Sequence, residues 1–348
     1  MKKIIPILII CIAIFCFAGC APKPTSTLYV LNATDSINGD TLKDFETANN
    51  VKIEYNNYEN PEDVYSILAS NPNKYDIIIA PNYVTSRLIQ EGSLLSLDKT
   101  KLTNYSKIMD GFTPYTSYTF PYMSGTLGIL YDANKIFAPI NSWTALWDNN
   151  YRDEIIMTSV ERDAISIAFK SMAFDINDKD PSHIDLVRQR LEEQFGTVQS
   201  WQNVNAPENM AWGRALLAAV TSNQAEMAVE KAAQTGYANL KYVIPSEGSV
   251  HVLYSMAIPK QSNNADMALK FINYMSTPSA SAQNSQATGL TSPISGTKEL
   301  LPQNMQNSAI MYPSAADLLL CKYNDYDIQT NIAYDQIWRI INASINKK

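Results

Sequence analysis

The stretch FPYMSGTLGILYDA, residues 120–133, decides the fold that we expect for this chain. It reads as a polar, aromatic turn at residues 121–125 that leads into an apolar strand at residues 126–131. Strands and helices alternate before this stretch and again after it, and a second apolar stretch at residues 253–258 could carry the chain back. Two connections between two α/β units form a hinge beside a cleft. The pattern therefore predicts a hinged, two-lobed α/β binding protein.

Apolar runs and helix signals mark out both units. Residues 75–80 form a continuous apolar run, which is typical of a parallel strand covered on both faces. Residues 60–63, Asn-Pro-Glu-Asp, form a helix start, so we expect Glu59 and Glu62 to be capping groups rather than ligand groups. The other elements expected include strands at residues 28–31, 51–55, 155–158, 226–229 and 241–244 and helices at residues 41–48, 181–195, 209–222, 265–275 and 329–344.

Length and charge bound the class of protein. The 348 residues exceed the usual size of one domain, and 46% hydrophobic residues are enough for two cores. The formal net charge of -7 disfavours nucleic acid as a partner and suits a cationic or neutral ligand.

The first twenty residues indicate where the protein acts. Lys2 and Lys3 precede an almost unbroken apolar segment at residues 4–17, as in a secretory leader. Small residues before Cys20 resemble the lipobox of bacterial lipoproteins, so we expect cleavage before Cys20 and attachment of lipid to it. The protein would then be exported and anchored to the membrane by that lipid, on the periplasmic or extracellular face. An N-terminal anchor that is never cut is the alternative.

Cysteines and histidines argue against a metal centre and against catalysis. If Cys20 carries lipid, Cys321 is the one cysteine left in the mature chain. His183 and His251 are far apart in sequence and near no cysteine, so we expect no metal site. Neither histidine has a nucleophile-like context, and the sequence shows no glycine-rich phosphate loop. We therefore expect a binding protein without a cofactor, and not an enzyme.

Acids and a tyrosine follow the predicted strands and are candidate ligand groups. In open α/β sheets, ligands bind beyond the carboxyl ends of the strands. Asp35 and Tyr83 follow two strands of the first unit, and Glu161 and Asp163 follow the first strand of the second unit. Carboxylates at these places could neutralise an ammonium group. The alternatives are a helix N-cap for Asp35 and compensation of a helix dipole for Glu161 and Asp163.

Eight segments share their order and spacing with one known family. They are LYVLNATD (28–35), EYNNYENPEDVY (54–65), YDIIIAPNYV (75–84), LDKTKLTNYSKI (97–108), FPYMSGTLGILYDA (120–133), SWTALWDNNYRDEI (142–155), IPSEGSVHVLYSMAIP (244–259) and LKFINYMSTP (269–278). Through them, nearly the whole mature chain is similar to bacterial spermidine/putrescine-binding proteins, the solute receptors of polyamine ABC importers.

The resemblance implies an architecture and partners. It implies two α/β lobes that clamp a ligand between them, a monomer, and partnership with a membrane permease and its ATPase. One lobe is expected at residues 27–125 plus 256–308. The other is expected at residues 126–255 plus 309–348, after the leader at residues 1–20.

The resemblance also implies which residues hold the ligand. A polyamine needs carboxylates for its ammonium groups and aromatic walls for its methylenes. Asp35 and Asp163 match acids of the family's site, and Tyr83 matches a tyrosine. Asn324 stands at the position of a glutamine. Other positions of the site are substituted, and they hold Ala33, Ser36, Val160, Val229, Val252, Tyr254 and Leu290.

Neighbouring residues could compensate for these substitutions. Glu161 and Glu230 each lie one residue from a substituted position and could restore charge. Tyr122 and Tyr254 could supply aromatic walls. We expect a polyamine as the ligand. The alternatives are another small organic cation, an amino-acid-like or thiamine-like compound, or a surface lipoprotein that acts as a sensor or adhesin.

Overall fold

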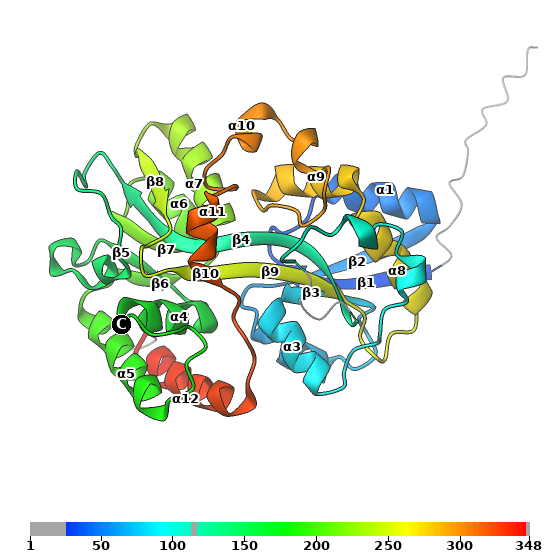
Figure 1. Cartoon of the computed structure of the whole chain (residues 1–348), viewed down its shortest axis with the longest axis horizontal. Coiled ribbons are helices and arrows are strands. Elements are labelled where there is room, and N and C mark those ends of the chain that lie inside the picture. The colour runs from blue at the N-terminus through cyan, green and yellow to red at the C-terminus, as the bar shows by residue number, and fades with distance from the viewer. Residues whose placement is uncertain (1–25, 113–116, 346–348) are drawn as a thin grey trace, which may run out of the picture.

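Two long antiparallel strands, β4 (Thr119–Asp132) and β9 (Ser249–Ala257), run through the middle of the molecule (Figure 1). All 14 residues of β4 are buried. The predicted turn at residues 121–125 is therefore wrong, because these residues continue the strand. Pro121 flanks a β-bulge, where its missing backbone N–H is tolerated, and this explains how a proline lies inside a central strand.

The computed structural model describes residues 26–112 and 117–345. The predicted leader at residues 1–20 and the predicted lipid attachment site at Cys20 lie outside these ranges. Within the described ranges, no helix combines the length and the apolar character needed to cross a bilayer.

The first lobe contains a mostly parallel sheet, as its apolar runs predict. β1 (Ser26–Ala33) pairs in parallel with β2 (Val51–Tyr58) and with β3 (Ile77–Pro81). β3 then pairs antiparallel with β9, so the strand order is β2-β1-β3-β9-β4. In Figure 1, α1 and α9 lie on one side of these strands and α3 lies on the other. The helices of this lobe are α1 (Gly39–Asn49), α2 (Asp63–Ser70), α3 (Asn82–Gln90), α8 (Ala265–Met275) and α9 (Pro278–Thr288).

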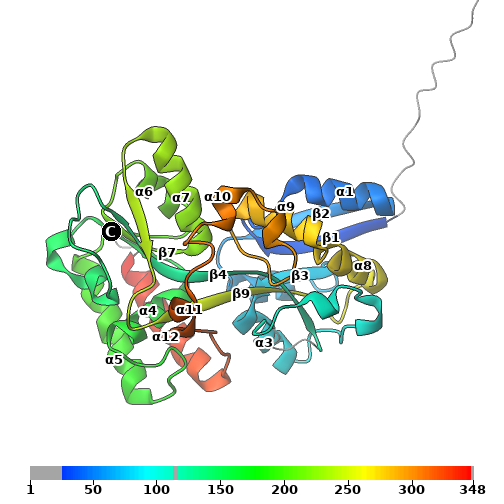
Figure 2. The same ribbon diagram turned by 45° about the horizontal axis from the view of Figure 1, so that its top comes forward.

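The second lobe continues the sheet from the other half of β4. The strand order there is β4-β7-β5-β6, and β8 also pairs with β4. Figure 2 shows the elements of the two lobes at the two ends of the crossing strands. The strands of this lobe are β5 (Ile155–Thr158), β6 (Ser200–Gln202), β7 (Leu217–Thr221) and β8 (Leu240–Val243), and its helices are α4 (Glu161–Ser171), α5 (Pro181–Glu192), α6 (Ala206–Ala211), α7 (Ser222–Thr235) and α12 (Ile328–Ile345).

Two predicted elements of the second lobe are wrong. Residues 209–222 do not form one helix, because α6 ends at Ala211 and β7 follows. Residues 226–229 belong to α7 and are not a strand. The short alanine-rich run of β7 fits a buried strand and a buried helix equally well, so periodicity alone could not separate them. A capping box formed by Thr221 and Gln224 marks the true start of α7.

The apolar side chains form separate cores in the two lobes. Phe45, Phe120 and Phe271 belong to a core on the β1–β3 side, and Trp143 and Phe169 belong to a core on the β5–β7 side. Tyr254 on β9 packs against both cores. The crossing strands therefore join two bodies, each with its own hydrophobic interior.

A third segment, residues 323–327, runs between the lobes before α12 begins. It follows β10 (Cys321–Lys322), which pairs in parallel with the start of β9. The hydroxyl of Tyr323 donates to the backbone oxygen of Gly111 at 3.0 Å, and the amide of Asn177 donates to the backbone oxygen of Tyr323 at 2.9 Å. This segment therefore contacts both lobes.

Candidate ligand-binding site

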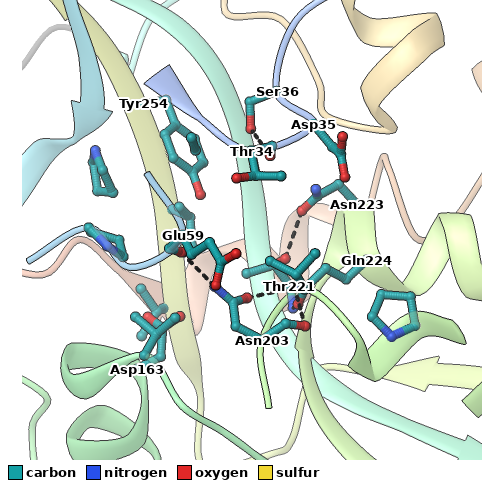
Figure 3. Close-up of a pocket in the computed structure, with 18 of the residues that line it drawn as sticks. Thr34, Asp35, Ser36, Glu59, Asp163, Asn203, Thr221, Asn223, Gln224 and Tyr254 are labelled. Atoms are coloured by element: carbon teal, nitrogen blue, oxygen red, sulfur yellow. Dashed lines mark hydrogen bonds between the residues drawn. The ribbon is translucent and has the colours of Figure 1, made fainter. Parts of the chain in front are cut away.

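A cavity of about 90 Å³ lies between the lobes. Its walls come from the segments that follow β1, β3, β5 and β7 and from the crossing strand β9. The polar and aromatic residues that line it include Thr34, Asp35, Ser36, Glu59, Asn82, Tyr83, Asp163, Asn203, Thr221, Asn223, Gln224, Tyr254 and Asn324 (Figure 3). Because these segments belong to both lobes, a solute in the cavity touches both.

Asp163 is the most perturbed carboxyl group that lines this cavity. It lies in the first turn of α4, where backbone N–H groups favour negative charge. Burial first, and then nearby Glu62, raise the pKa of Asp163 to about 7, and Arg162 opposes the shift. An ionised Asp163 is therefore poorly compensated by the protein's own groups, and an ammonium group beside it would offset its charge.

Asp35 belongs to the first lobe and is exposed, in the turn that follows β1. Its backbone φ of 54° is left-handed, a conformation that aspartate tolerates better than most residues. The N-cap role considered for it belongs instead to Asn38, whose side chain accepts from the Asp40 backbone N–H at 2.7 Å. In Figure 3, Asp35 and Asp163 lie at opposite ends of the drawn group of side chains.

The two tyrosines at the cavity have different roles. Tyr254 projects from β9, and Figure 3 shows its hydroxyl directed into the space between the lobes. Burial, and then Asp163, raise the pKa of Tyr254. Tyr83 is buried, and its hydroxyl donates to Glu62 Oε1 at 2.8 Å. Tyr254 is therefore free to face a ligand, whereas the hydroxyl of Tyr83 is engaged by the protein.

Asn324 lines the cavity from the third segment between the lobes. Its side-chain oxygen accepts from Ser166 Oγ at 3.0 Å, and its backbone oxygen accepts from Asn82 Nδ2 at 2.7 Å. Ser166 belongs to α4 and Asn82 to α3, so Asn324 connects helices of the two lobes.

Three other predicted ligand residues do not line the cavity. Tyr122 is buried in the first lobe, and its hydroxyl donates to the Ser36 backbone oxygen at 3.0 Å. Glu161 is 9% exposed and interacts with Asp335, a contact that helps burial and Glu62 to raise the pKa of Glu161. Glu230 is exposed on α7. Sequence adjacency to a substituted position therefore did not bring these side chains to the cavity.

A network of amide and hydroxyl groups on the second-lobe wall was not predicted from the sequence. Asn203 Nδ2 donates to the Glu59 backbone oxygen at 2.8 Å, and Gln224 Nε2 donates to Asn203 Oδ1 at 2.8 Å. Thr221 Oγ1 donates to Asn223 Oδ1 at 2.7 Å. The capping-box pair Thr221 and Gln224 was the available signal, but the misplaced helix at residues 209–222 hid the end of β7.

Glu62 stands at the N-cap position of α2, as predicted, whereas Glu59 does not cap that helix. The side chain of Glu62 makes no capping hydrogen bond to α2 and accepts from Tyr83 instead. Glu59 is exposed at the cavity, and its backbone oxygen receives Asn203. Both residues face the second lobe, and local helix signals carry no information about that contact.

Comparison with known proteins adds independent evidence. The family model described as bacterial extracellular solute-binding protein matches residues 40–312. The spermidine/putrescine-binding periplasmic protein of Salmonella typhimurium is 25% identical over 324 residues, which covers 91% of this chain and 92% of the relative. The protein of the same name from Escherichia coli is 25% identical over 326 residues, with the same two coverages.

Solved structures share the fold. A structure from Listeria monocytogenes, assigned to a spermidine/putrescine ABC transporter, is 27% identical with a TM-score of 0.84 and covers 91% of this chain and 98% of that chain. These findings confirm the two-lobed α/β architecture and the resemblance on which it was predicted. The chain belongs to the family of bacterial extracellular solute-binding proteins.

Proposed function

We propose that this protein is the lipid-anchored, extracytoplasmic receptor of an ABC importer and that its ligand is a short polyamine. The observation that carries the proposal is the pair of carboxylates, Asp163 and Asp35, that line one cavity from opposite lobes. The names of the relatives support it, since they are spermidine/putrescine-binding proteins.

The chemistry of the cavity suits a short diamine. An ammonium group donates charge-assisted hydrogen bonds to a carboxylate, and the ring of Tyr254 can pack against methylenes or attract a cation. Val160 and Val252 add apolar wall. A water needs roughly 10–15 Å³ of such space, so the cavity of about 90 Å³ suits a ligand of only a few heavy atoms. The two ammonium groups of the ligand would bind the carboxylates, and its methylenes would pack against the aromatic and apolar wall.

Binding would work through closure of two lobes, at residues 27–125 plus 256–308 and residues 126–255 plus 309–348. The separate hydrophobic cores support this division. One small cluster, which includes Leu301 and Met311, spans the proposed boundary near residue 308. A ligand favours the closed form only through contacts that the open form lacks, and here these contacts come from both lobes.

The remaining parts of the proposal concern partners and location. A lipid on Cys20 would tether the receptor to the membrane, and a permease with its ATPase would take up the delivered solute. We expect a monomer that binds no nucleic acid and performs no catalysis.

Thermal unfolding of the chain from residue 21 tests the ligand. Ligand at a hundred times its dissociation constant should add about 2.7 kcal/mol of stability. We expect shifts with putrescine or spermidine and none with 1,4-butanediol, which has the same length as putrescine but no charge. A shift with amino acids or thiamine and none with polyamines would refute the polyamine assignment.

A further inference from the structure

The loop between β2 and α2, residues 59–62, reaches across the cleft to the second lobe. At its start, the Glu59 backbone oxygen accepts from Asn203 Nδ2 at 2.8 Å. At its end, Glu62 accepts from the Tyr83 hydroxyl at 2.8 Å and is close enough to the backbone N–H of Arg162 for that group to lower its pKa. Arg162 lies in the first turn of α4. The loop therefore makes two contacts between the lobes, on a backbone oxygen and on a carboxylate.

The Glu62 carboxylate acts electrostatically on two carboxylates of the second lobe, across the contact that joins the lobes in this structure. It acts on Asp163 and on Glu161, and for each of these it is the largest influence on the pKa after burial. Burial also raises the pKa of Glu62 itself. Titratable and charged groups from both lobes interact with Glu62: Asp63, Tyr58, Tyr65 and Tyr83 of the first lobe and Glu161, Arg162 and Asp163 of α4. Asp335 of α12 interacts with Glu161.

Arg162 is the cation in this group, but its guanidinium is turned towards other partners. Its Nη2 donates to Asn177 Oδ1 at 2.8 Å and to the Ile176 backbone oxygen at 3.2 Å. It also donates to the Asp325 backbone oxygen at 3.4 Å. Closing the lobes therefore places Glu62 near Asp163 with incomplete compensation from the protein.

We propose that Glu62 is a specificity-determining residue that makes closure of the lobes depend on a cationic ligand. Opening separates Glu62 from Asp163, because they belong to different lobes, and this relieves the repulsion between them. An ammonium group beside Asp163 offsets the same repulsion in the closed form. A neutral solute of the same shape fills the cavity but does not offset the repulsion between the carboxylates of Glu62 and Asp163. Glu62 thus selects for charge without lining the cavity.

Protonation of these carboxyl groups should favour the closed form without a ligand, although less strongly than a cationic ligand does. The closed form holds its carboxyl protons to higher pH than the open form, in which these groups are solvated. A conformation that binds more protons gains population as the pH falls. The ligand-free protein should therefore close as the pH falls below about 7, which is the pKa of Asp163 in the closed form.

The first test needs no ligand and uses the mature chain. Small-angle X-ray scattering between pH 5.5 and 8 should show a smaller radius of gyration at acid pH for the wild type. Glu62→Gln keeps an acceptor for Tyr83 but removes the charge, so it should be more compact than the wild type at pH 8 and change less with pH, the remaining change coming from burial of Asp163. Asp163→Asn, which removes the opposing charge, should do the same. Asp44→Asn is the matched control, since Asp44 is exposed on α1 and makes the same change in charge away from the cleft, and it should behave like the wild type. Equal pH dependence in wild type and in both cleft variants would overturn the proposal.

The second test measures selectivity by calorimetry with putrescine and 1,4-butanediol. This part rests on the proposed polyamine ligand. Glu62→Gln should reduce the preference for putrescine over the diol on the order of tenfold, because one of the charges that oppose closure is gone. An unchanged preference would overturn the role of Glu62. If the wild type binds no polyamine but closes with acid as expected, the polyamine ligand is refuted while the closure result supports Glu62.

Discussion

The substitution Asp163→Asn should stabilise the ligand-free protein and remove tight binding of a cation. The wild-type carboxyl has a pKa of about 7 in the folded protein, chiefly because of burial. In the unfolded chain, the pKa of an aspartate is about 3.9. The folded state therefore resists ionisation of this group, and at neutral pH or above the ionised side chain destabilises the protein. Asparagine has a similar shape and carries no charge, so the variant avoids this penalty.

The sign and size of the effect follow from linkage between protonation and folding. Because the folded pKa is the higher one, the folded state binds more protons between pH 4 and pH 7, so the contribution of this group to stability falls as the pH rises through that window. A difference of about three units corresponds to at most ~4 kcal/mol. Opening of the lobes solvates the side chain and limits this penalty, so we expect ~1–3 kcal/mol at pH 8 and little difference at pH 4.

Urea unfolding of wild type and variant at pH 4, 6 and 8 measures this difference. Asp44→Asn is the matched control, because Asp44 is exposed on α1 and the change in chemistry is the same. Calorimetry with putrescine should show at least a thirtyfold loss of affinity for Asp163→Asn, since loss of a paired carboxylate removes about 2–5 kcal/mol. A variant that is no more stable than wild type at pH 8 would show that the charge of Asp163 is already compensated, which would refute this prediction.

Other substitutions probe the ring of Tyr254, the contact of Asn203 between the lobes, and the buried Trp143. Tyr254→Phe keeps the ring and should weaken putrescine binding less than tenfold, whereas Tyr254→Ala should weaken it more. Calorimetry measures both affinities, and equal losses of affinity would assign the effect to the hydroxyl. Asn203→Ala removes the 2.8 Å bond to Glu59, worth about 1 kcal/mol, and should speed ligand dissociation about fivefold in stopped-flow measurements; an unchanged rate would contradict its closure role. Trp143→Ala should cost ~3–5 kcal/mol in urea unfolding, because the ring is fully buried and its Nε1 donates to the Gly248 backbone oxygen at 2.8 Å; a loss below ~1 kcal/mol would contradict this.

Local signals predicted most of the elements. The apolar run that ends at Thr158 and the amphipathic segment Ala265–Met275 coincide with β5 and α8, because burial on a strand or on one helix face leaves a periodic trace in the sequence. The errors lie where the pattern of residues fits more than one kind of element. β7 is a short run rich in alanine, and Pro121 suggested a turn inside a strand that a bulge makes possible.

The candidate site was predictable only in part. Asp35, Tyr83 and Asp163 follow strands, and the rule that ligands lie beyond the carboxyl ends of strands places them together at the cavity. Glu161 occupies the same helical turn as Asp163 but faces Asp335. The direction of a side chain around a helix depends on what packs beside that helix, and a partner from α12 far along the chain cannot be read from the neighbouring residues.

The sequence by itself determined two α/β units, the strands that cross between them and the acids at the strand ends, because these depend on short-range periodicity and on residue chemistry. Only the tertiary structure decided which charges meet. Glu62 looks like the start of a helix, yet its carboxylate lies beside the first turn of α4 because β4 and β9 bring the two lobes together around one cavity. Contacts between residues one hundred positions apart are set by packing of whole lobes, and no local pattern records them.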